Sequence, residues 1–222
     1  MLFLHGYLSS GDSFIYQKAY FERYFNVFTP DLKGFGKNQG MEWPYSLNDY
    51  LTEVKEYMYK NSIVYPNLIA HSFGGRIALK GASEDKNLFD KLVLTGCAGL
   101  KPKATIKKCF KRGVFLVAKR FIPKERLQAF YSKDYRELSP VMKESFKKIV
   151  SEHLDDRLPF IYNKTLLIFG KNDRETPIYM AKRLNSGIKN SSLLLFENAG
   201  HFCFIDESLK FNMEVREFLL SE

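Results

Sequence analysis

The sequence of 222 residues is poor in cysteine and has no long apolar run. Its three cysteines, Cys97, Cys109 and Cys203, are far apart, and no Cys-x-x-Cys pair or Cys/His cluster occurs. This pattern excludes a dense disulfide framework and gives no sign of a metal site, so we interpret the cysteines as reduced thiols. No apolar run approaches the ~20 residues that a membrane-spanning helix needs. Residues 1–6 have no basic n-region and no small-residue cleavage site, so we expect a cytoplasmic protein.

Apolar and aromatic side chains, by contrast, are abundant. Apolar residues make up 45% of the chain, and 20 residues are phenylalanine. This composition is typical of a globular protein and excludes a disordered one, which could not form a core. A length of 222 residues fits one domain with a substantial core.

The net charge of +9 is concentrated in one segment. Residues 101–160 hold 16 Lys and Arg against 7 Asp and Glu, and the rest of the chain is balanced. Two interpretations stay open: a solvated helical surface, or a surface that attracts anionic substrates or a membrane. For the second, the relevant side chains flank an apolar helix face: Lys107, Lys108, Lys111 and Arg112. We do not expect nucleic-acid binding, because no recognised module accompanies the charge.

Short apolar strands alternate with helices along most of the chain. We predict strands over residues 2–4, 26–29, 67–70, 91–95, 165–169 and 193–196. We predict helices over residues 13–24, 46–61, 74–82, 177–187 and 207–220, the second starting with a variant capping box of Ser46 and Asp49. Thr176 and Pro177 are interpreted as the N-cap and the first residue of the predicted helix 177–187. The alternation predicts an α/β fold with a mostly parallel sheet and helices on both faces.

Residues 101–160 interrupt this alternation and contain no convincing strand. Apolar residues recur there at helical spacings of three and four: Ile106, Phe110, Val114, Val117 and Phe121. A second helix starts at Ser139-Pro140, and we place Phe146, Ile149 and Val150 on one of its sides. We therefore predict a core of residues 1–100 and 161–222 with a helical cap inserted at 101–160.

The segment Ala70-His71-Ser72-Phe73-Gly74-Gly75 lies between a buried strand and a helix of small residues. This is the context of a nucleophile elbow, Gly-x-Ser-x-Gly, in which a sharp turn exposes the serine hydroxyl above the sheet. Small residues are needed on both sides of the serine because the turn brings backbones together. Ala70 replaces the usual first glycine, a mild departure. The alternative is an ordinary glycine-containing turn between strand and helix.

Two later segments supply partners for this serine. Asp173 follows the predicted strand 165–169, and His201 follows the strand 193–196 after a short loop. The ends of parallel strands share one edge of the sheet, where ligands bind in open α/β folds. A serine hydroxyl needs a histidine to take its proton and a carboxylate to orient that histidine. We therefore predict Ser72, His201 and Asp173 as nucleophile, base and acid.

Other residues compete for these roles. Glu175 is an alternative acid, but Asp173 lies nearer the strand end. We interpret Asp31 as a residue that shapes its own loop, and Asp206 as a helix cap. His5 and His71 are assigned structural roles.

A serine hydrolase also needs N–H groups for the negative oxygen of its tetrahedral intermediate. We predict that the backbone N–H groups of Phe73 and Tyr7 form this oxyanion hole. No metal or organic cofactor is required. For Trp43 and Tyr45, lining of the pocket entrance and packing in the core both stay open.

These motifs together resemble the α/β-hydrolase superfamily, and in particular its cap-bearing esterase, lactonase and carbon–carbon-bond hydrolase branches. The resemblance rests on five segments, His5–Tyr7, Asp31–Gly36, Ala70–Gly75, Gly170–Asp173 and Ala199–Phe202. A serine rather than an aspartate at position 72 argues against the haloalkane dehalogenase and epoxide hydrolase branches. Members usually carry two further strands before the His-Gly loop. The N-terminal strands are therefore expected to be missing here, which would leave about six.

The residues thus predict a carboxylesterase-like serine hydrolase that cleaves an ester, thioester or related acyl bond through an acyl-enzyme. Its partner would be a small-molecule acyl substrate, which the basic segment would favour as an anion. Alternatives are carbon–carbon-bond hydrolysis or acyl transfer by the same triad, a receptor with very slow turnover, and a membrane-associated lipid hydrolase. The sequence gives no oligomeric state.

Overall fold

The computed structural model describes residues 1–103 and 133–221. The first predicted helix of the cap, from Ile106 to Phe121, lies outside the described residues. So do Cys109 and the four basic residues that flank the apolar face of that helix. The division into a core and a cap at 101–160 therefore stays a prediction.

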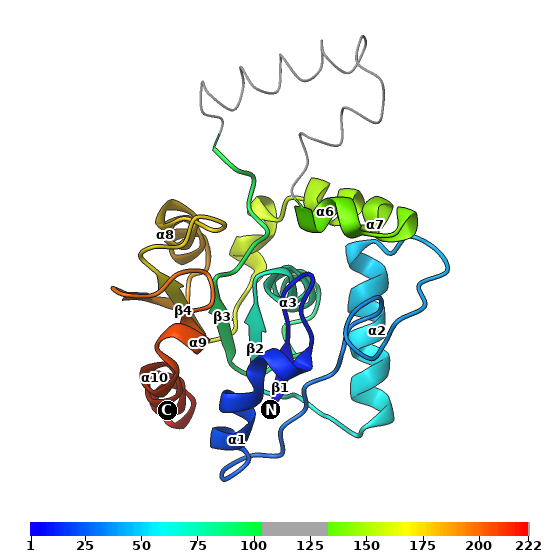
Figure 1. Cartoon of the computed structure of the whole chain (residues 1–222). Coiled ribbons are helices and arrows are strands. Elements are labelled where there is room, and N and C mark those ends of the chain that lie inside the picture. Colours follow the sequence, from blue (N-terminus) through cyan, green and yellow to red (C-terminus); the bar gives the residue numbers. More distant parts are fainter. Residues whose placement is uncertain (104–132, 222) are drawn as a thin grey trace.

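A parallel sheet of five strands forms the centre of the molecule (Figure 1). The strands pair in chain order: β1 (Leu2–Leu4), β2 (Leu68–His71), β3 (Leu92–Thr95), β4 (Thr165–Gly170) and β5 (Ser191–Phe196). Leu4 lies opposite Ala70, and Ala70 lies opposite Leu94, so the first three strands end almost level. The loops that follow these strands therefore meet at one edge of the sheet.

The prediction of a sixth strand at residues 26–29 is wrong in the described structure. Only one bridge forms there, in which Phe3 N–H donates to the Phe28 carbonyl (2.9 Å) and Phe28 N–H donates to the Met1 carbonyl (3.0 Å). The next residue but one, Pro30, has no N–H for a ladder. Asp31 then accepts the Gly11 N–H at 2.7 Å, which ties the chain to a different loop.

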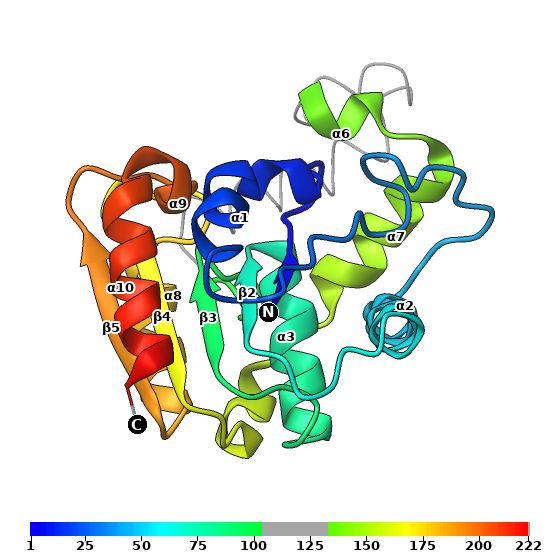
Figure 2. The same cartoon turned by 90° about the horizontal axis from the view of Figure 1, so that it is seen from below.

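Helices cover both faces of the sheet, as predicted. The elements α1 (Ile15–Phe21), α9 (Cys203–Asp206) and α10 (Ser208–Leu220) cover one face, and α2 (Leu47–Lys60), α3 (Phe73–Glu84) and α8 (Ile178–Gly187) cover the other (Figure 2). The predicted capping box of Ser46 and Asp49 starts α2. The predicted helix at 13–24 is instead a 3₁₀ turn, η1 (Gly11–Phe14), followed by the shorter α1.

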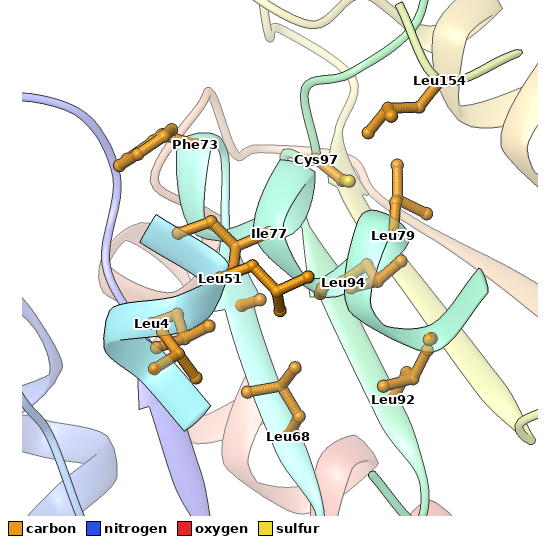
Figure 3. Close-up of a cluster of buried hydrophobic side chains, with 14 of the residues drawn as sticks. Leu4, Leu51, Leu68, Phe73, Ile77, Leu79, Leu92, Leu94, Cys97 and Leu154 are labelled. Atoms are coloured by element: carbon orange, nitrogen blue, oxygen red, sulfur yellow. The ribbon is translucent and has the colours of Figure 1, made fainter. Parts of the chain in front are cut away.

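The hydrophobic core consists of two layers that the strand alternation separates. Leu4, Leu68 and Leu92 point toward α2 and α3, where they meet side chains such as Leu51 and Ile77 (Figure 3). The residues between them in the strands point toward α1 and α10: Phe3, Ile69 and Val93. Both faces of the strands are thus buried, which explains why they appear in the sequence as continuous apolar runs.

Three elements of the predicted cap are described: α6 (Lys133–Glu137), α7 (Pro140–Ser151) and the 3₁₀ helix η3 (Asp155–Phe160). Ser139 caps α7, because its hydroxyl accepts the Met142 N–H at 3.3 Å. Ile149 is buried on the inner face as predicted, but Val150 is 37% exposed. The period of an α-helix places Val150 about 100° away from Ile149.

Both ends of helix α7 form hydrogen bonds with segments that follow the strands: one end with α3, the other with the loop after β1. The Arg76 guanidinium of α3 is 8% exposed. Its Nη1 donates to the carbonyls of Ile149 and Glu152, each at 2.9 Å, at the C-terminal end of α7. At the other end, the Tyr7 hydroxyl donates to the Met142 carbonyl at 3.0 Å. These bonds fix α7 over the loops that follow β1 and β2.

Among the helices in residues 1–103 and 133–221, none combines the length and apolar character needed to cross a bilayer.

Candidate active site

Ser72 occupies a strained turn between β2 and α3. Its backbone angles are φ 48° and ψ −103°, a conformation that non-glycine residues avoid and that persists only where the surroundings enforce it. Ser72 N–H donates to the Thr95 carbonyl, and the Ser72 carbonyl accepts the Ala98 N–H, both at 3.1 Å. A Cβ on Gly74 would collide with the Leu4 carbonyl, so a glycine is required there. The local geometry is that of a nucleophile elbow.

Asp173 and His201 are in direct contact. His201 Nδ1 lies 2.8 Å from Asp173 Oδ2, and the Asp173 carboxylate is only 5% exposed. Burial alone would raise the pKa of Asp173, but hydrogen bonds from His201 and Thr176 overcome it and hold the pKa at about 2. The carboxylate is therefore ionised at neutral pH and accepts a hydrogen bond from the Nδ1–H of His201. This leaves Nε2 of a neutral His201 ring as the basic nitrogen.

His71 lies between the loop after β1 and the loop that contains His201. Its Nε2 donates to the His201 carbonyl at 3.1 Å, and the two rings lie 4.7 Å apart between centroids. Burial, and secondarily the neighbouring His201, lower the pKa of His71 to about 3, so the ring stays neutral. Its Nδ1 faces Gly6, where a Cβ would come within 2.8 Å. Gly6 is thus the residue that lets the loop after β1 pack against His71.

The predicted oxyanion donors lie in the loops after β1 and β2. In the described part of the chain, neither Tyr7 N–H nor Phe73 N–H has a hydrogen-bond acceptor. Phe73 is the first residue of α3, so its N–H lies at the N-terminus of that helix, where the helix dipole is positive. His5 orients the Tyr7 loop: its Nε2 accepts the Leu32 N–H at 3.0 Å, and its Nδ1 donates to the Gly6 carbonyl at 2.7 Å.

Ser72 and His201 line one cavity of about 790 Å³. Tyr7, Leu8, Phe146 and Phe202 contribute much of its apolar wall; the other described residues that line it are Gly6, Ser9, His71, Tyr135, Glu137, Leu138 and Glu175. Within the described residues, the Ser72 hydroxyl makes no hydrogen bond to His201, although both face the same space. Such bonds are often long before substrate binds. The cavity therefore opens onto Ser72, His201 and Tyr7 together.

A family model described as "alpha/beta hydrolase fold" matches residues 1–134, more than half of the chain. The chain belongs to the α/β-hydrolase fold family. A second model, described as "TAP-like protein", matches residues 148–222 of this α/β-hydrolase. Membership in the family supports hydrolytic activity and agrees with the sequence-based resemblance.

Known relatives span nearly the whole chain. The AB hydrolase superfamily protein YisY of Bacillus subtilis is 27% identical over 248 residues, covering 98% of this chain and 90% of the relative. The 2-hydroxy-6-oxo-2,4-heptadienoate hydrolase of Pseudomonas putida is 22% identical over 224 residues, covering 90% of this chain and 80% of that enzyme. Among solved structures, an esterase from Exiguobacterium antarcticum has a TM-score of 0.78 at 24% identity, covering 99% and 91% of the two chains. At this sequence identity, the likeness to the esterase structure concerns the fold alone.

Two positioning residues of this α/β-hydrolase were misassigned from the sequence. Thr176 is not the N-cap of α8, because Pro177 holds that position. Its hydroxyl instead donates to Asp173 Oδ2 at 2.7 Å. Asp206 does not cap α10 but ends α9, and its Oδ2 accepts the Gly200 N–H at 2.8 Å, beside His201. In the sequence, the only mark of these hydrogen-bonding roles is a short polar residue in the segment after a strand. Many positions meet that description, so the sequence alone does not single out Thr176 or Asp206.

Three further candidates form no hydrogen bond with the predicted catalytic triad within the described residues. Asp31 accepts the Gly11 and Lys37 N–H groups, so it shapes its own loop as predicted. Trp43 is 57% exposed, and neither it nor Tyr45 lines the cavity of Ser72. No three His, Cys, Asp or Glu side chains of the described residues converge as metal ligands would.

Proposed function

We propose that this α/β-hydrolase is a serine hydrolase that cleaves a carboxylic ester, thioester or related acyl bond through an acyl-enzyme. The observation that carries the proposal is the bond between ionised Asp173 and Nδ1 of His201, in the cavity that Ser72 also lines. This pairing supplies the orienting acid and leaves the free Nε2 that an activated serine requires.

In the proposed reaction, Ser72 Oγ attacks the acyl carbonyl while His201 Nε2 takes its proton. Asp173 stabilises the resulting imidazolium, and the N–H groups of Tyr7 and Phe73 bind the negative oxygen. The intermediate collapses when His201 protonates the leaving group, which departs and leaves an ester on Ser72. A water molecule, deprotonated by His201, then attacks this ester and releases the acid.

Carbon–carbon-bond hydrolysis is the second candidate. Its support is the P. putida relative, whose name describes a 2-hydroxy-6-oxo-2,4-heptadienoate hydrolase. Acyl transfer to an alcohol would use the same residues. A panel of ester and carbon–carbon-bond substrates, assayed with and without alcohol acceptors, separates the three reactions. The class of substrate that is cleaved distinguishes the two hydrolyses, and only acyl transfer gives a new ester. The cap at 101–160 and a cytoplasmic location remain predictions of the same proposal.

The first test is labelling by a fluorophosphonate probe, which reacts only with an activated serine. Wild-type protein should be labelled, whereas Ser72→Ala and His201→Ala should not. Ser9→Ala and His153→Ala serve as matched controls: Ser9 lines the same cavity, and His153 is exposed outside it. Both controls should label at the wild-type rate. Absence of labelling of a folded wild type, or persistent labelling of Ser72→Ala, would refute the proposal.

A further inference from the structure

The cavity of Ser72 contains two carboxylates that the proposed mechanism does not use. Glu137 is the last residue of α6, and Glu175 lies in the loop after β4, two residues beyond Asp173. Both are exposed, and both line the cavity. The other described polar side chains of the lining are hydroxyls and imidazoles. Among these described residues, therefore, Glu137 and Glu175 are the only ones with a carboxylate side chain.

Neither carboxylate is neutralised by a described neighbour. Within residues 1–103 and 133–221, Glu137 and Glu175 form no salt bridge and accept no side-chain hydrogen bond. Two other acids of the predicted cap are paired: Glu152 lies 2.8 Å from Lys80 Nζ, and Asp155 contacts Arg183. The contact of Glu175 with Asp173 involves only the backbone N–H of Glu175, which donates to Asp173 at 2.8 Å, and not the Glu175 carboxylate. No described residue thus competes with a bound molecule for the carboxylates of Glu137 and Glu175.

The rest of the lining is apolar and aromatic. Tyr7 and Phe146 both line the cavity and have ring centroids 5.1 Å apart. Phe202, which also lines it, is 42% exposed, and its ring lies 5.4 Å from that of His201. Because His201 protonates the leaving group in the proposed reaction, Phe202 borders the position of that group. An exposed aromatic face near a carboxylate accommodates apolar and cationic groups.

We propose that Glu137 and Glu175 determine substrate charge: the site prefers acyl substrates with a neutral or cationic leaving group over those with a carboxylate. This inference rests on the proposed serine hydrolase function. It runs against the expectation of an anionic substrate, which came from the basic excess of residues 101–160. The field inside a pocket depends mainly on the nearest charges, since more distant exposed charges are screened by salt.

The expected size of the effect follows from Coulomb's law. A single charge across roughly 8 Å of water-like surroundings changes binding of a unit charge by about a factor of two. Because it acts with opposite sign on a cation and an anion, each carboxylate should change the ratio of their kcat/KM values by about five-fold. This contribution should largely disappear in 1 M salt, where the screening length is only about 3 Å.

The test uses three thiobutyrate esters whose leaving groups differ in charge: thiocholine, its neutral 3,3-dimethylbutyl analogue, and 3-mercaptopropionate. Thiol release gives kcat/KM for the wild type, Glu137→Gln, Glu175→Gln and the double variant. The cation-to-anion ratio should exceed one in the wild type and fall about five-fold for each substitution. Glu217→Gln is the matched control, because Glu217 is exposed on α10 and lines no described cavity. Its ratio should equal that of the wild type.

Two kinds of failure are distinguishable. Hydrolysis of the neutral ester together with an unchanged ratio in the double variant, or a wild-type preference for the anion, overturns the charge selection alone. Absence of both thiol release and fluorophosphonate labelling removes the proposed function, and the inference with it. If the protein is labelled but releases no thiol, the labelling rates with a cationic and an anionic phosphonofluoridate are measured instead. Their ratio replaces the cation-to-anion ratio of kcat/KM values, and the same outcomes support or overturn the charge selection.

Discussion

The loops after β4 and β5 hold Asp173 and His201 with side-chain hydrogen bonds, whereas the turn after β2 holds Ser72 with main-chain hydrogen bonds. On the first side, Asp173 accepts bonds from His201 and from the hydroxyl of Thr176. On the second, Ser72 is held at φ 48° by main-chain bonds, and Gly74 permits the close approach of β1.

This difference determines how each side should fail. A side-chain network can lose one partner while the backbone keeps its shape, so the chemistry fails and the fold survives. A strained turn tolerates no added atom, so the fold fails together with the chemistry. Substitutions on the two sides should therefore separate activity from stability.

The largest effect is expected for Asp173→Asn on the side-chain side. An asparagine amide does not enforce the His201 tautomer with a free Nε2, so kcat should fall by about 10⁴-fold with little change in KM. The free energy of unfolding should change much less than activity. Asp156→Asn, at an exposed aspartate outside the cavity, is the control. Steady-state kinetics and urea unfolding of both variants check this, and a full-activity Asp173→Asn enzyme would remove Asp173 from the mechanism.

The next effect is expected for Gly74→Ala on the main-chain side. The new Cβ would collide with the Leu4 carbonyl, so the free energy of unfolding should fall by about 3 kcal/mol and labelling of Ser72 should be lost. Gly200→Ala is a matched control beside His201, because its Cβ would meet only Asp206 Oδ2, at 3.6 Å. Urea denaturation should show little change for this second variant. Equal destabilisation of the two variants would contradict the comparison.

A smaller effect concerns stability against acid. The folded-state pKa of Asp173 is about 2, below the ordinary aspartate value of 3.8, so its ionised form stabilises the fold. That contribution is present above the unfolded pKa and is lost as pH falls through the folded one, over about pH 4 to 2. It amounts to about 2 kcal/mol. Unfolding curves at several pH values should show the wild type losing this amount relative to Asp173→Asn. Parallel pH profiles would argue against the depressed pKa.

Much of the main-chain side could be predicted from the sequence. Strands buried on both faces appear as apolar runs such as Leu68–Ala70, and the residue after such a run lies at the catalytic edge. The strand ends and the chain order led to Ser72, Asp173 and His201. In the structure Ser72 and His201 line one cavity and Asp173 lies 2.8 Å from His201, while their catalytic roles stay a prediction. These features depend on local patterns that a single sequence contains.

What could not be predicted depends on contacts between distant segments. Residues 26–29 look like a strand, yet only Phe28 pairs, because the following residues bond to the loop of Gly11. The Thr176 hydroxyl has two acceptable local uses, as a helix cap or as a donor to Asp173, and the spacing does not choose between them. The exposed position of Trp43 likewise depends on the course of its loop.

The buried Arg76 has a consequence for exchanging the predicted cap between relatives. Its guanidinium sits on the same helix as the nucleophile turn and is satisfied by carbonyls of a segment more than seventy residues away. A grafted cap that ends its last helix elsewhere would leave this cation buried without acceptors, a cost of several kcal/mol. Chimeras should therefore be joined so that a helix terminus still faces Arg76, or should carry a neutral residue at that position.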